Sequence, residues 1–225
     1  FDSELLFEQA ARLIRDTEPS MPDGNLRIVL TANHSIVHLA DVAYPDDALY
    51  KEGITTRTLK WERVEPHLKV FRGDYQRAVA ETMAQQTTYG VPYEVLLVNN
   101  EDQITEGSRS NFFVLHNNTV FSPPEEDILI GITRKYVLKS IEVAGLKYEE
   151  KTFSLDDLNI LCEESDNSPA VFVTSSPFDI LPIKSIDEVL FNSADNKALA
   201  RVSKAYQQIV DFYIQSRSSD KDVIE

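Results

Sequence analysis

The stretch Thr105-Glu106-Gly107-Ser108-Arg109-Ser110-Asn111-Phe112-Phe113 carries the strongest signal in this chain. It places one carboxylate, among small hydroxyl and amide side chains, between two apolar runs at residues 95–98 and 112–115. Such runs are typical of buried strands. A glutamate at their junction is shielded from water, where an unpaired carboxylate is costly, so Glu106 is expected to have a cationic or proton-donating partner. Function is therefore sought around Glu106.

Composition limits the classes of protein that fit. The chain has 225 residues, of which 42% are hydrophobic, enough for one large domain or for one domain and part of another. Its formal net charge of −15 repels phosphate backbones, so no nucleic-acid partner is expected. No apolar run approaches membrane-spanning length and no signal-peptide pattern is present. We therefore expect no membrane association and a cytoplasmic location.

Cysteine and histidine give little support for a metal site. Cys162 is the only cysteine, which excludes an internal disulfide and a cysteine-rich zinc site and fits a reducing compartment. His34 and His38 are four residues apart, a metal-binding spacing on a helix, but their surroundings are typical of a strand. No metal site is expected.

The N-terminal part of the chain predicts the remainder of a small α/β domain. Apolar residues at helical spacing predict a helix over 3–16, and β-branched residues predict strands over 26–31 and 36–43. The chain opens with Phe1 and enters directly what reads as the middle of a fold, so we expect this domain to be truncated. The expected boundaries are residues 1–48 for the small domain, 49–53 for a linker and 54–225 for a larger domain.

Two places in the larger domain could bind an anion. A predicted helix over 132–144 follows Gly131 directly, and the free N–H groups and dipole of such a helix start can hold a phosphate. Alternatively, Gly131 is only a turn residue. A predicted strand over 170–173 ends in Thr174-Ser175-Ser176, whose hydroxyls could form a second anion site or only satisfy local backbone groups.

Taken in order, four motifs resemble the class IV, or fold type IV, pyridoxal-phosphate enzymes, which include branched-chain and D-amino acid aminotransferases and aminodeoxychorismate lyase. The motifs are Lys69, Thr105-Glu106-Gly107, Gly131-Ile132-Thr133-Arg134 and Thr174-Ser175-Ser176. The resemblance covers roughly residues 20–190, and its specificity depends on the joint order. It implies an α+β, two-domain fold like that of D-amino acid aminotransferase, with a barrel-like sheet in the larger domain.

The resemblance also implies roles for individual residues. Lys69 would form a Schiff base with pyridoxal 5'-phosphate, for which its amine must be neutral. Glu106 would keep the pyridine nitrogen protonated, so that the ring can accept electrons. The remaining cofactor-binding residues that the resemblance implies are Ser110 and Asn111 around Glu106, Leu129 against the ring face, and Gly131, Ile132, Thr133, Ser175 and Ser176 at the phosphate.

Three functions remain open at this point. The resemblance favours an aminotransferase that acts on a small amino acid and a 2-oxo acid and forms a homodimer. The second is elimination of the aminodeoxychorismate lyase type, and the third is a catalytically silent relative that serves as a binding module. Retention of both Lys69 and Glu106 argues against the third. No position matches the family's N-terminal phosphate-binding arginine, and Ala32-Asn33 stands where the D-amino acid enzymes carry a carboxylate-binding arginine.

Overall fold

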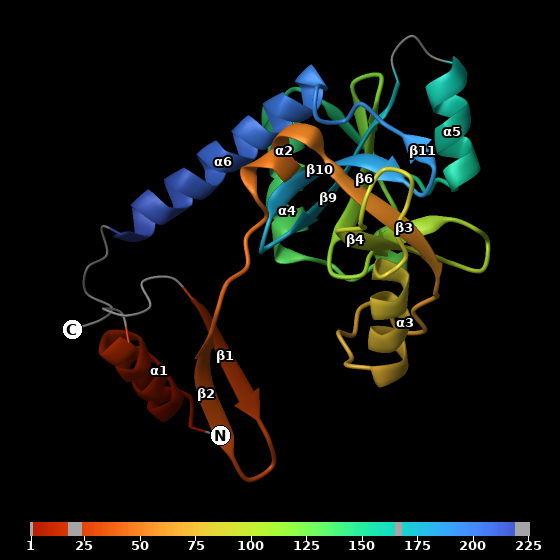
Figure 1. The fold of residues 1–225 in the computed structure, drawn as a ribbon. Coiled ribbons are helices and arrows are strands. Elements are labelled where there is room, and N and C mark those ends of the chain that lie inside the picture. Colours follow the sequence, from red (N-terminus) through yellow and green to blue (C-terminus); the bar gives the residue numbers. More distant parts are fainter. Residues whose placement is uncertain (1, 18–23, 165–167, 219–225) are drawn as a thin grey trace. The chain divides into compact units, whose positions relative to one another are not determined.

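The computed structural model describes residues 2–17, 24–164 and 168–218, and its fold is α+β (Figure 1). The chain divides into two compact units, one of residues 1–44 with 216–225 and one of residues 45–215. Phe1, where the sequence suggests a truncated start, lies outside the described residues. Each unit has its own sheet, so the two are described separately.

The smaller unit consists of one helix and one hairpin. Helix α1 (Ser3–Thr17) lies against strand β2 (Ser35–Ala40), which pairs antiparallel with β1 (Asn25–Leu30). The predicted helix and both predicted strands are thereby confirmed, with ends that differ by at most three residues. Ala10 is the one buried residue of α1 in the described part of the chain. This unit therefore has little core of its own.

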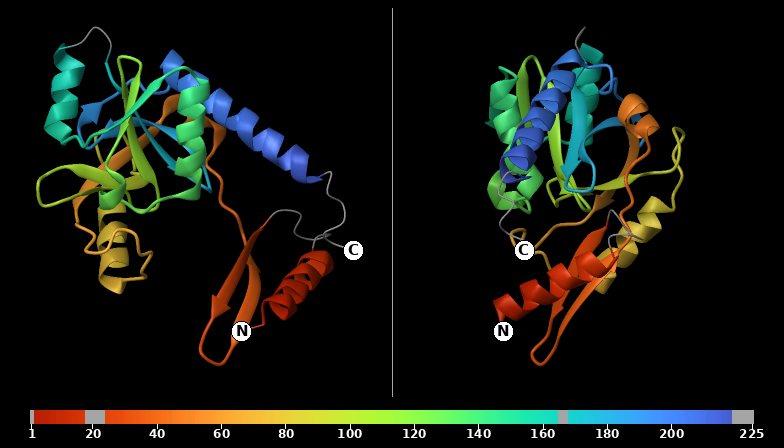
Figure 2. Two further views of the ribbon diagram at one scale, coloured as in Figure 1. Left: turned by 180° about the vertical axis from the view of Figure 1, so that it is seen from behind. Right: turned by 90° about the vertical axis from the view of Figure 1, so that its left-hand side faces the viewer.

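The larger unit is organised around a closed barrel that is part of a nine-stranded sheet. Figures 1 and 2 show the ribbon of this unit from three directions. The ring closes because β9 pairs with both β10 and β6. In order around the ring, the barrel strands are β10 (Asp179–Ile186), β3 (Ile54–Lys60), β4 (Glu94–Val98), β5 (Ile104–Gly107), β6 (Asn111–His116) and β9 (Ala170–Ser175). The barrel-like sheet that the resemblance implied is confirmed.

Three further strands extend the sheet. They are β7 (Thr119–Ser122) beside β6, β8 (Lys147–Glu150) beside β7 and β11 (Val189–Leu190) beside β10. Strand β3 runs parallel to β4 and to β10, whereas the other barrel pairs are antiparallel. The parallel β3–β4 connection is a crossover that contains helix α3 (Gly73–Met83), as parallel neighbours require.

The continuous apolar runs of β6 and β9 are explained by burial on both faces. Phe112 and Val114 belong to a core cluster that takes a residue from each of the six barrel strands. Phe113 and Leu115 point the other way into a second cluster, where Phe113 stacks on Phe172 of β9 with ring centroids 5.0 Å apart. Alternating side chains of one strand therefore fill both cores.

Two helices pack on the outer face of the barrel, and a third contributes to its core. Helices α4 (Ile132–Val143) and α6 (Lys197–Ser218) supply Val137, Ile141, Leu199 and Val202 to the second cluster, while α5 (Leu155–Glu164) supplies Leu158 to the first. The short helices α2 (Asp47–Glu52) and η1 (Glu125–Asp127) complete the unit. The predicted helix over 132–144 is confirmed, and its start is held beside the barrel by this packing.

Two regions differ from the sequence-based expectation. Residues 49–52, expected in a linker, form part of α2 within the larger unit, where Leu49 packs against the barrel core. The expected domain boundaries stay a prediction. Strand β10 was not predicted, because Pro182 interrupts its apolar run and proline is disfavoured inside a sheet. The structure accommodates Pro182 opposite Phe172, and the register with β3 begins only at Ile183.

Candidate functional site

The candidate site begins at the turn between β5 and β6. Glu106 is paired with Asn111 across the two strands, and the N–H of Gly107 donates to the carbonyl of Ser110 at 2.7 Å. A Cβ on Gly107 would lie 1.9 Å from the Ser110 Oγ, so no larger residue fits the turn as it stands. The two side chains that flank the turn, Glu106 and Asn111, are therefore held close together.

Glu106 is a buried carboxylate with incomplete hydrogen bonding. Its side chain is only 3% exposed; Oε2 accepts from the N–H of Leu129 at 3.2 Å, and Oε1 lies 2.6 Å from Arg63 Nε. Arg63 and Glu106 thus form an ion pair. Among the described residues, neither Arg63 Nε nor Glu106 Oε1 has a hydrogen-bond partner with the required alignment. Burial raises the pKa of Glu106 to about 7, against the opposing charge of Arg63. Glu106 can therefore hold or share a proton near neutral pH.

Asn111 connects this carboxylate to the segment before α4. Its Nδ2 donates to the carbonyl of Leu129 at 2.8 Å, and the N–H of Leu129 is the group that reaches Glu106. A Cβ on Gly131 would lie 2.4 Å from the Asn111 Oδ1, so glycine is needed for this approach. Asn111, Leu129 and Gly131 thus form one continuous wall beside Glu106.

The start of α4 offers donors for an anion. Gly131 is the N-terminal flanking residue and has no side-chain cap, so the first N–H groups of the helix have no capping side chain. The buried Thr133 Oγ1 lies 3.2 Å from the Ser176 Oγ, which joins this helix to the end of β9. Ile132 is 76% exposed, so the helix start is open to solvent. Hydroxyl and amide donors at a positive helix end suit a phosphate.

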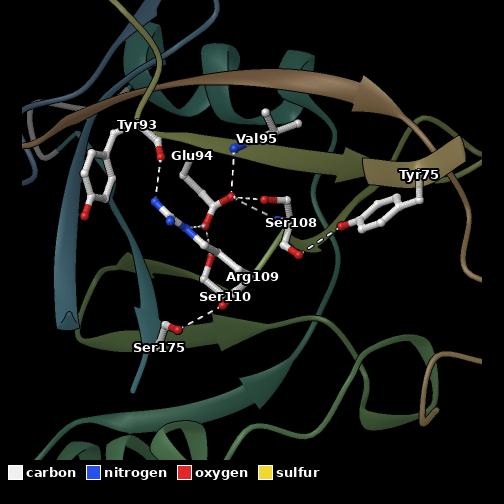
Figure 3. A network of polar contacts seen from close by, with 8 residues as sticks. All are labelled: Tyr75, Tyr93, Glu94, Val95, Ser108, Arg109, Ser110 and Ser175. Carbon is white, nitrogen blue, oxygen red and sulfur yellow. Dashed lines mark hydrogen bonds and ion pairs between the residues drawn. The ribbon is translucent and has the colours of Figure 1, made fainter. Parts of the chain in front are cut away.

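The other two serines proposed at the site make different contacts. Ser175 Oγ donates to the carbonyl of Arg109 at 2.9 Å, and Ser110 Oγ donates to Glu94 Oε2 at 3.0 Å (Figure 3). In the described structure these two hydroxyls therefore support the β5–β6 turn, and Ser176 is the serine beside Thr133.

Within the described residues, Lys69 makes no hydrogen bond or ion pair with the other proposed site residues. Its side chain is exposed in the irregular segment over residues 61–72, and Arg63 is the residue of that segment that contacts Glu106. The same segment lines a pocket of about 150 Å³ with Trp61, Arg63, Arg72 and Tyr75 among its walls. The assignment of Lys69 stays a prediction.

Sequence reasoning missed the buried Glu94 and the contact of Arg63. Glu94 is 0% exposed and accepts hydrogen bonds from the β5–β6 turn. The one available signal was a charged residue at the head of the apolar run over 95–98. In the described part of the chain, no cluster of three or more His, Cys, Asp or Glu could hold a metal ion, and no helix there is long and apolar enough to cross a membrane.

Known proteins are similar to this chain in sequence and in fold. The chain is 32% identical over 120 residues to a D-alanine aminotransferase of Bacillus licheniformis, an alignment that covers 52% of this chain and 40% of the relative. In structure it is similar to a branched-chain aminotransferase of Thermoproteus uzoniensis, with a TM-score of 0.67, 21% identity and coverage of 93% and 72% of the two chains. A provisionally assigned 4-amino-4-deoxychorismate lyase of Legionella pneumophila gives a TM-score of 0.69, with 18% identity and coverage of 92% and 77%.

The chain spans 40–52% of the length of the first four curated relatives that it matches. The family model for class IV aminotransferases matches residues 2–186, which is most of the sequence. This match includes the barrel strands β3 to β9 and the turn that carries Glu106. The chain belongs to the class IV aminotransferase family.

Proposed function

We propose that the protein is a pyridoxal-phosphate-dependent aminotransferase that acts on a small amino acid and a 2-oxo acid. The observation that carries this proposal is Glu106, a carboxylate with a 3% exposed side chain and a pKa raised to about 7 by burial. It lies beside the Asn111–Leu129 wall, in the same unit as the open helix start at Thr133. This combination suits a ligand with a basic ring nitrogen at one end and a phosphate at the other.

The donor set fits pyridoxal phosphate at both ends. At the ring end, Glu106 Oε1 has no aligned hydrogen-bond partner and is paired with Arg63 Nε at 2.6 Å, so a pyridinium N–H would take the place of the Arg63 guanidinium. At the phosphate end, the N–H groups of Ile132 and Thr133 have no capping side chain, and the Thr133 and Ser176 hydroxyls lie together. When bound, the cofactor supplies an electron-accepting ring conjugated to the reacting carbon.

The residues of the chain then have distinct tasks. Glu106 holds the proton at the ring nitrogen, and its raised pKa lets it share that proton near neutral pH. Thr133 and Ser176 fix the phosphate, while Leu129 contributes its half-buried side chain to the ring face. Lys69 is the proposed point of covalent attachment, and its neutral amine would then move the substrate proton.

Elimination of the lyase type is the second candidate, because the same lysine, carboxylate and phosphate donors serve both reactions. The two differ in whether a 2-oxo acid acceptor is needed. The test is to supply the purified protein and cofactor with small L-amino and D-amino acids, with and without a 2-oxo acid. We expect amino-group transfer that requires the acceptor. Repeated release of pyruvate from 4-amino-4-deoxychorismate without an acceptor would favour elimination. The absence of both activities would contradict the proposal.

A further inference from the structure

A second carboxylate, Glu94 at the start of β4, is completely buried close to the candidate site. Its Oε1 accepts from the N–H of Val95 at 2.9 Å, from the N–H of Ser108 at 3.1 Å and from the Ser108 hydroxyl at 2.6 Å (Figure 3). Its Oε2 accepts from the Ser110 hydroxyl at 3.0 Å and lies 3.6 Å from Arg109 Nε. Glu94 is therefore surrounded by donors, as a buried charge requires.

Three of these donors belong to the turn that connects Glu106 to Asn111. The carboxylate accepts from the hydroxyls of Ser108 and Ser110, and Tyr75 donates its own hydroxyl to the Ser108 carbonyl at 2.9 Å. The turn is thus held at several atoms, although it is only a few residues long. Its two ends, Glu106 and Asn111, are the residues proposed to meet the cofactor ring.

The same network extends to the end of β9. The Arg109 guanidinium donates to the Tyr93 carbonyl at 3.1 Å and lies 5.1 Å from the centroid of the Tyr93 ring. The Arg109 carbonyl accepts from the Ser175 hydroxyl at 2.9 Å, and Ser176 next to it meets Thr133. One set of contacts therefore links the proposed ring end and the proposed phosphate end.

A neutral side chain could accept some of these hydrogen bonds without the cost of burying a charge. A purely stabilising role would therefore explain the buried carboxylate poorly, because proteins in which a buried ion is replaced by an apolar or neutral side chain are often as stable. Its charge orients four donors and attracts Arg109 at once, which suits accurate placement of neighbouring groups.

We propose that Glu94 is a positioning residue: it presents Glu106 and Asn111 to the cofactor ring and couples them, through Arg109 and Ser175, to the phosphate donors. This inference rests on the proposed function. Glu94 makes no contact with the cofactor itself in the proposal and acts through the turn over residues 107–110.

The experiment compares Glu94→Gln with Asp187→Asn. Asp187 is a suitable control because it also accepts from a main-chain N–H and a hydroxyl, both of Thr58, and pairs with Arg57 instead of a site residue. For each protein, the melting temperature without cofactor and the dissociation constants of pyridoxal phosphate and pyridoxal are measured. Pyridoxal lacks the phosphate and reports on the ring end alone.

We expect Glu94→Gln to weaken binding of both aldehydes by about tenfold or more, while its melting temperature without cofactor falls no further than that of Asp187→Asn. A merely structural role would lower the melting temperature and leave both dissociation constants unchanged, which would overturn the inference. If Glu94→Gln does not fold, Ser108→Ala removes one donor to Glu94 and should weaken both aldehydes about threefold or more. Unchanged binding by that variant would equally overturn it.

The wild-type protein separates this inference from the proposed function. If the wild type binds neither aldehyde, the proposed function fails and the inference fails with it. If the wild type and all variants bind alike, only the inference fails.

Discussion

Burial gives Glu106 a pH-dependent effect on the stability of the protein. The folded protein raises its pKa to about 7 from an ordinary value of 4.5, chiefly through burial. Between these pH values the folded protein keeps a proton that the unfolded chain has lost. The stability from this proton is fully present below pH 4.5 and is lost as the pH rises through 7. Without its cofactor, the protein therefore carries a destabilising charge at neutral pH and above.

Replacing Glu106 by glutamine should remove that cost. We expect Glu106→Gln without cofactor to be more stable than the wild type at pH 8, by about 3 kcal/mol, and similar to it near pH 4. Denaturant unfolding at several pH values measures this, with Glu101→Gln at an exposed turn as the control for loss of one negative charge. With cofactor present, the same Gln substitution should lower turnover strongly, because the ring nitrogen loses its proton-holding partner. Lower stability of Glu106→Gln at pH 8 would contradict the raised pKa.

At the scale of elements, we propose that the start of α4 binds the phosphate of the cofactor. Thr133→Val removes one hydroxyl from this start and keeps the size of the side chain. We expect it to weaken the binding of pyridoxal phosphate by about 10-fold to 100-fold, because a hydrogen bond to a charged group is lost. The binding of pyridoxal should not change. Titration of both aldehydes measures the difference. The control is Ser140→Ala in the same helix, whose buried hydroxyl donates to the Tyr136 carbonyl at 2.7 Å. Equal weakening of both aldehydes would argue against a phosphate at this helix start.

The sequence predicted the elements with strong periodicity and missed those set by distant pairing. The runs that became β4 and β6 could be predicted because each is a short continuous apolar segment, and α4 could be predicted because its apolar residues recur at helical spacing. Strand β10 could not, since Pro182 reads as a strand breaker until its partners are known. Glu94 was missed because its donors come from a turn that meets it only through the β4–β5 register, and the Arg63–Glu106 ion pair likewise joins distant segments.

At the scale of the whole molecule, the family resemblance leads us to propose a two-fold homodimer. Within the described residues, the strand β1 leaves Leu26, Ile28 and Leu30 between 37% and 51% exposed, so apolar surface is available for a partner. We expect light scattering to give twice the mass of the chain. Saturating pyridoxal phosphate should also raise the melting temperature, since a ligand at 100 times its dissociation constant adds about 2.7 kcal/mol. A monomer whose melting temperature ignores the cofactor would contradict both the dimer and the site.

The central claim, that Lys69 and Glu106 together serve a pyridoxal-phosphate site, is tested most directly by locating the cofactor on the chain. The holoprotein is reduced with borohydride, digested and mapped by mass spectrometry, with Lys60→Ala and Lys69→Ala treated in parallel. Lys60 is the control because it is a nearby exposed lysine that pairs with Asp102 at 2.8 Å. We expect loss of the yellow colour on reduction, a pyridoxyl group on Lys69 in the wild type and in Lys60→Ala, and none in Lys69→Ala. A pyridoxyl group on Lys60, or on no lysine, would contradict this claim.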